Sequence, residues 1–110
     1  MIKSTMKKIK TKIQQESSMT KQGKTDLLKL VSKLESEISK VSKADAEHAQ
    51  SIAGFIERST HEATRQKKNP ELLNLSLAGL KESAKGFEAS HPKLVADISN
   101  FCTALANVGI

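Results

Sequence analysis

The chain has 110 residues, a formal net charge of +6, 37% hydrophobic and 27% charged residues, one cysteine, and neither Trp nor Tyr. This length and composition indicate one ordinary globular domain that needs no disulfide to be stable. The two prolines and the many Lys, Glu, Leu, Ala and Ser residues favour long helices over a sheet. No apolar run approaches the ~20 residues of a membrane span, so we expect a cytoplasmic protein.

The net charge belongs to the N-terminal segment. Residues 1–25 contain seven Lys and one Glu, whereas residues 26–110 contain eleven basic and eleven acidic side chains. A uniformly basic nucleic-acid-binding domain would not show this division. We therefore divide the chain into a basic amphipathic N-terminal helix, residues 1–18, and a helical bundle domain, residues 19–110.

The first predicted helix spans residues 2–16. Its apolar side chains share one stripe and are Ile2, Met6, Ile9 and Ile13. Lysines cover its other faces and form a candidate anion-binding arm that consists of Lys3, Lys7, Lys8, Lys10 and Lys12. Thr20 or Thr25 is expected to cap the helix that follows.

Three interpretations of the basic helix remain open. It could bind an anionic membrane surface, bind nucleic-acid phosphates, or pack its stripe on the bundle and leave the lysines in water. A stripe without Trp, Phe or Leu makes a poor membrane anchor. An arm without Arg or aromatic residues lacks the groups that read or stack on bases.

The second predicted helix spans residues 21–41, and its apolar residues recur at alternating steps of four and three. These residues are Leu27, Val31, Leu34, Ile38 and Val41. A capping-box spacing from Ser42 to Asp45 predicts that a third helix begins near residue 43 and ends near residue 66. The third helix contains mostly small apolar residues and Gly54, at which we expect close packing or a bend.

The Asn69–Pro70 pair predicts the start of a fourth helix, which we expect to run to about residue 90. Its stripe consists of Leu73, Leu77, Leu80, Ala84 and Phe87, with Leu72 and Leu75 beside it. Gly79 and Gly86 fall on one side of this helix and predict the close approach of a neighbouring helix.

The His91–Pro92 pair breaks the chain, and a fifth helix follows it. Its apolar face consists of Leu94, Ile98, Phe101, Leu105 and Val108. We interpret the last segment, residues 87–110, as the part around which the other helices pack. Four or five amphipathic helices with this spacing predict an all-α fold, an antiparallel helical bundle.

The sequence offers no constellation for catalysis. His61–Glu62 begins like a zinc-protease helix, but Arg65 occupies the position of the required second His. Each carboxylate sits on a polar helix position with Lys or Ser neighbours, and Cys102 is predicted to be a buried core thiol. Gly-rich phosphate loops, nucleophile elbows and Cys-x-x-Cys pairs are missing from the sequence. We therefore expect no enzyme, no metal site and no cofactor.

Two motifs stand near the C-terminal end. They are Phe87-Glu88-x-x-His91-Pro92-x-Leu94 and Leu105-Ala106-Asn107-x-Gly109-Ile110. With these motifs the chain resembles the bacterial domain-of-unknown-function family DUF4404. The resemblance implies a small helical bacterial protein and brings no catalytic residue with it.

Both motifs have a structural interpretation. Phe87 is expected to fill the core, so that Phe87→Ala would cost ~3–5 kcal/mol, while Glu88 and His91 fix the corner before Pro92. The terminal Gly109–Ile110 is expected to close the end of the bundle, and a docking tail that ends in the free carboxylate is the alternative.

The expected function is protein–protein association. Long apolar stripes in so small a bundle can leave part of a stripe uncovered, which makes self-association the first hypothesis. The alternative is the binding of nucleic acid or an anionic membrane surface through the Lys-rich arm.

Overall fold

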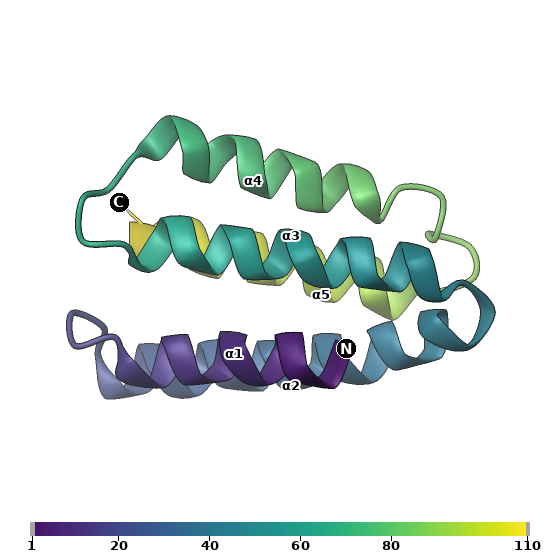
Figure 1. Cartoon of the computed structure of the whole chain (residues 1–110), viewed down its shortest axis with the longest axis horizontal. Helices are drawn as coiled ribbons and strands as arrows, with labels where there is room; N and C mark the ends of the chain where they lie inside the picture. Colours follow the sequence, from purple (N-terminus) through teal and green to yellow (C-terminus); the bar gives the residue numbers. More distant parts are fainter. Residues whose placement is uncertain (1, 110) are drawn as a thin grey trace.

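The computed structural model describes residues 2–109, which form five helices and contain no strand (Figure 1). The helices are α1 (Ile2–Gln15), α2 (Lys21–Ala44), α3 (Ala46–Thr64), α4 (Pro70–Ser83) and α5 (Pro92–Gly109). Successive helices run in opposite directions along the long axis of the molecule. The predicted all-α bundle is therefore confirmed. No helix within residues 2–109 is long and apolar enough to cross a membrane.

Two predicted helix starts are confirmed by their caps. The Thr20 hydroxyl accepts a hydrogen bond from the Gly23 N–H at 3.0 Å at the start of α2. The Asn69 side-chain oxygen accepts one from the Leu72 N–H at 3.2 Å, and Pro70 is the first residue of α4. Each cap satisfies a backbone donor that has no partner inside its helix.

The boundary between α2 and α3 lies later than predicted. Ser42 belongs to α2, and the capping residue of α3 is Asp45, whose carboxylate accepts the His48 N–H at 3.0 Å. The Asp45 N–H in turn donates to the Val41 carbonyl at 2.8 Å. Because aspartate is a strong cap by itself, one residue both ends α2 and starts α3, and the predicted box around Ser42 is not formed.

Helix α4 ends at Ser83, about two turns earlier than predicted. Gly86 has a φ of +96°, a left-handed conformation that glycine adopts without steric cost, so it lies in the turn after the helix. The predicted helical packing role of Gly86 is therefore wrong. The predicted close approach at Gly79 is confirmed, because a Cβ there would lie 2.8 Å from Phe55 Cδ1.

The central helix is α3 and not the C-terminal segment. It contacts all four other helices, whereas α5 contacts α2, α3 and α4. Three fully buried alanines, Ala49, Ala53 and Ala63, let neighbouring helices approach its backbone. The small apolar side chains that the sequence places in this helix are therefore the reason that it can occupy the centre.

Helix α1 is packed on the bundle by its apolar stripe. Met6, Ile9 and Ile13 are at most 1% exposed, and α1 contacts α2 and α3. This arrangement is the third interpretation of the basic helix, in which its apolar stripe packs on the bundle. The same core includes residues of α5, of which Phe101 is the largest fully buried side chain.

Candidate functional site

The corner between α4 and α5 is held by local hydrogen bonds, one to a side chain and one within the backbone. The Gly86 N–H donates to Glu88 Oε2 at 2.8 Å, and the His91 N–H donates to the Phe87 carbonyl at 2.7 Å. Pro92 is the first residue of α5, where a missing N–H leaves no hydrogen bond unmade. Glu88 is exposed and His91 is partly buried, so the corner forms a surface turn.

Phe87 lies between two imidazole rings and not in the deep core. Its ring centroid is 4.9 Å from that of His48 and 5.8 Å from that of His91. His48 also donates from Nε2 to the Ser83 carbonyl, which joins the start of α3 to the end of α4. Phe87 is only half-buried, so the predicted loss of ~3–5 kcal/mol on its truncation is too large.

The C-terminal motif combines a core position with a surface position. Leu105 is completely buried, whereas Asn107 is exposed near the loop between α1 and α2. Gly109 is the last residue of α5. Ile110, which we assigned to bundle closure or to a docking tail, lies outside the described residues.

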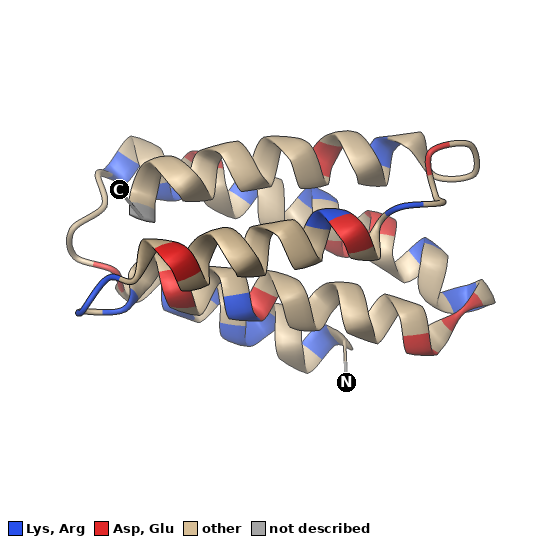
Figure 2. Cartoon of the chain, turned by 90° about the horizontal axis from the view of Figure 1, so that it is seen from above, with Lys and Arg blue, Asp and Glu red and all other residues tan. Residues whose placement is uncertain are grey.

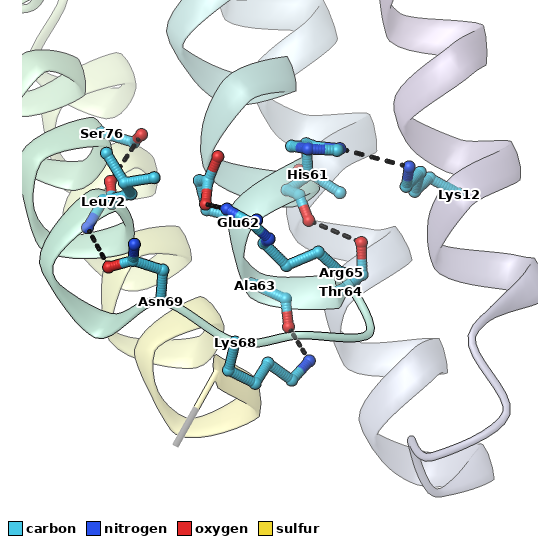
Figure 3. Close-up of polar contacts among 11 residues, drawn as sticks. Lys12, His61, Glu62, Ala63, Thr64, Arg65, Lys68, Asn69, Leu72 and Ser76 are labelled. Atoms are coloured by element: carbon cyan, nitrogen blue, oxygen red, sulfur yellow. Dashed lines mark hydrogen bonds and ion pairs between the residues drawn. The ribbon is translucent and has the colours of Figure 1, made fainter.

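Four of the five arm lysines are exposed, and one is paired. Lys10 forms an ion pair with Glu35 of α2 at 2.7 Å, which fastens α1 to its neighbour. The exposed lysines are Lys3, Lys7, Lys8 and Lys12. Lys12 Nζ lies 3.4 Å from Nδ1 of His61 on α3 (Figure 3). The sequence pattern could not show this contact, because it depends on the packing of α1 against α3.

Helix α3 contains polar groups that the sequence pattern assigned to solvent. The Glu62 carboxylate is buried and accepts a hydrogen bond from Arg65 at 2.8 Å (Figure 3). Glu37 of α2 is also buried and pairs with Lys40 at 3.2 Å. Both glutamates occupy polar positions of the sequence pattern and are nonetheless buried. Ser59 Oγ is buried and has no hydrogen-bond partner within residues 2–109.

The one cysteine of the chain lies in the core of the described structure. Cys102 is buried as predicted, and desolvation raises the pKa of its thiol, with Lys81 opposing the effect. A buried thiol with a raised pKa is a poor nucleophile at neutral pH. The described part of the chain contains no group of three His, Cys, Asp or Glu side chains that could hold a metal ion.

The most distinctive exposed feature is apolar. Phe55, Leu72 and Leu75, which we call the α4 surface, are 38%, 41% and 68% exposed. Leu72 and Leu75 are three residues apart on one face of α4, and Phe55 of α3 covers Gly79 one turn beyond them. In Figure 2, α4 lies nearest the viewer, and its charged residues are confined to its two ends.

The sequence explains why this surface exists. Helix α4 has five leucines in 14 residues, more than a single stripe can bury, and it contacts only α3 and α5. Leu73, Leu77 and Leu80 face those neighbours, and the other two leucines remain in water. Leu72 and Leu75 lie beside the stripe in the sequence pattern, and residues in that position are the ones that no neighbouring helix buries.

Comparison with known proteins shows the family. No curated protein and no solved structure matches the chain. A family model described as "Domain of unknown function (DUF4404)" matches residues 27–110, from Leu27, the first residue of the apolar stripe of α2, to the C-terminal motif. The match includes the corner and the central helix α3 and leaves α1 outside. Because it covers more than half of the chain, the protein belongs to the DUF4404 family.

Proposed function

We propose that the protein acts without catalysis, by associating with a second copy of its own chain through the α4 surface. The observation that supports this proposal is the shared exposure of Phe55, Leu72 and Leu75. Apolar side chains that are exposed singly need no explanation, but Leu72 and Leu75 share one face of α4, and Phe55 of α3 lies against Gly79 on that helix. A group of exposed apolar side chains of this kind is typical of an interaction site. A buried, unpaired Cys102 fits a reducing compartment, and we infer a cytoplasmic setting.

The apolar character of the α4 surface favours a second copy as the occupant, because both copies present the same exposed leucines and the charged residues of α4 lie at its ends. A two-fold axis near Leu75 would place two α4 helices side by side in antiparallel orientation, so that one surface serves both copies. Leu75 then meets its counterpart, and Leu72 lies opposite the exposed Ala78 of the other copy. At each end, Lys68 of one copy would approach Glu82 of the other, but Lys68 donates to the Ala63 carbonyl of its own chain and Glu82 pairs with its own Lys85 at 3.6 Å. The apolar centre, and not these charges, therefore sets the register.

The size of the surface limits the affinity. Stable interfaces bury about 800 Å² on each partner, and three partly exposed side chains provide only the centre of such an area. Much of the gain from their burial is offset by the loss of rotational and translational freedom. We therefore expect a dimer with a Kd on the order of micromolar or weaker.

Sedimentation velocity over concentrations from about 10 µM to 1 mM tests the proposal, with refractive index reporting concentration because the chain lacks Trp and Tyr. The wild-type chain should shift from monomer to dimer. Leu75→Lys should remain monomeric, because two lysines would meet at the axis. Asn74→Lys adds the same charge about 100° away around the helix and should still dimerise.

Two outcomes would contradict this proposal. One is a wild-type chain that is monomeric throughout the concentration range. The other is an equal loss of dimer in both lysine variants, which would mean that added charge and not the α4 surface is responsible. High salt should leave the wild-type dimer largely intact, because its centre is apolar.

A further inference from the structure

We propose that a groove between α1 and α3 binds the phosphate group of a small phosphorylated ligand. The groove has a volume of about 490 Å³, and Lys8, Lys12, Arg58 and His61 contribute to its lining. None of the three residues of the α4 surface is among the residues that line the groove, although Phe55 follows the groove residue Gly54 along α3. The site can therefore exist whether or not the chain dimerises.

Helical spacing brings these side chains together. Lys8 and Lys12 are one turn apart on α1, and Arg58 and His61 are three residues apart on α3. Because α1 and α3 pack against each other, the two pairs face one groove. The 3.4 Å contact from Lys12 Nζ to His61 Nδ1 spans the two helices (Figure 3).

The positive charge of the groove is not neutralised within the chain. No ion pair in the described structure involves Lys8, Lys12 or Arg58. Lys10 of α1 and Arg65 of α3, by contrast, are each paired with a glutamate. Glu57 is the single acidic side chain among the residues that line the groove. An anion entering the groove would meet an excess of cationic donors.

The groove also has room for a ligand group. A Cβ added at Gly54 would meet no atom within 4 Å, so the glycine leaves open space beside the cations. Ile9 and Thr60, both buried, form part of the wall beneath. The volume lies within the range of about 300–1,000 Å³ that is typical of small-molecule sites.

The side chains specify the class of ligand. An Arg guanidinium can donate two parallel hydrogen bonds to phosphate oxygens, and lysines add point charges. No Phe lines the groove and the chain has no Tyr or Trp, so His61 supplies the one ring among the lining residues and a run of stacked bases has no platform there. Nucleic acid would instead be expected to follow the exposed lysines outside the groove, such as Lys3 and Lys7. These features favour a compact phosphate group over an extended polyanion.

Titration of the folded protein with inorganic pyrophosphate at constant ionic strength, followed by amide NMR, tests the assignment. We expect saturable shifts centred on Gly54 and Arg58. Lys8→Gln combined with Arg58→Gln should weaken binding at least about tenfold, because each removed contact is a charged hydrogen bond. Lys3→Gln combined with Lys7→Gln removes the same charge outside the groove and should weaken it less than about threefold.

A variant without a charge change separates the groove from general electrostatics. Gly54→Leu would fill the open space and should abolish the saturable shifts, while a cooperative thermal transition shows that the protein still folds. Shifts that do not saturate, or an equal loss in both double variants, would overturn the proposal. Tight binding of a single-stranded oligonucleotide that both double variants weaken equally would assign this face to nucleic acid instead.

Discussion

The same substitution should have opposite effects at two helical glycines. A Cβ at Gly54 meets no atom within 4 Å, whereas a Cβ at Gly79 would lie 2.8 Å from Cδ1 and 3.1 Å from Cζ of Phe55. Neither glycine has a positive φ, so an alanine fits the backbone conformation at both positions. The difference between the two sites is therefore the available space.

The magnitudes follow from these surroundings. Gly54→Ala should increase the free energy of unfolding by about 0.5–1 kcal/mol, because alanine loses less conformational entropy in a helix. Gly79→Ala makes the same gain but displaces the Phe55 ring, and overpacking costs about 1–3 kcal/mol. The ring is 38% exposed and can move outward, so we expect a net loss near the lower end of that range.

Urea denaturation followed by far-UV circular dichroism measures both effects. A double-mutant cycle isolates the contact: in a Phe55→Ala background, Gly79→Ala should become stabilising, as Gly54→Ala is in the wild-type chain. If Gly79→Ala stabilises the wild-type chain as much as Gly54→Ala does, the close approach of α3 and α4 at this point is refuted.

Four further substitutions test the core and the corner. Phe101→Ala should lower the free energy of unfolding by about 3–5 kcal/mol because that ring is completely buried, and half-buried Phe87→Ala should cost clearly less; equal urea midpoints would contradict this ranking. Ser59→Ala should raise stability by about 1 kcal/mol in the same assay, because it removes a buried hydroxyl without a partner. The raised pKa of Cys102 means that the unfolded thiol ionises first, so stability should fall as pH rises above the ordinary thiol pKa. Cys102→Ala should remove that part of the pH dependence, and an unchanged profile would show that other groups cause it.

Helix starts were predictable because their signals are local. Thr20 and the Asn69–Pro70 pair act on backbone donors within three residues of themselves, so their effect can be inferred from neighbours in sequence. The end of α4 was predicted less well. A periodic stripe that continued to Phe87 favoured a longer helix, while the left-handed conformation of Gly86 ended it.

Tertiary features were beyond the sequence pattern. The burial of Glu62 depends on the central position of α3, and its polar neighbours along the chain gave no sign of it. The candidate groove is a similar case. Arg58 and His61 are distant in sequence from Lys8 and Lys12, and only the packing of α1 on α3 brings them together. The apolar α4 surface was closer to prediction, since an excess of leucines can be counted.

The most direct test of association through α4 is disulfide cross-linking at its proposed centre. Leu75→Cys places a thiol near the two-fold axis, where Cα atoms must lie roughly 4.4–6.8 Å apart to form a disulfide, while the native Cys102 is buried. Under mild oxidation we predict rapid formation of a covalent dimer by Leu75→Cys and not by Asn74→Cys. Equally slow cross-linking of the two variants would contradict the account.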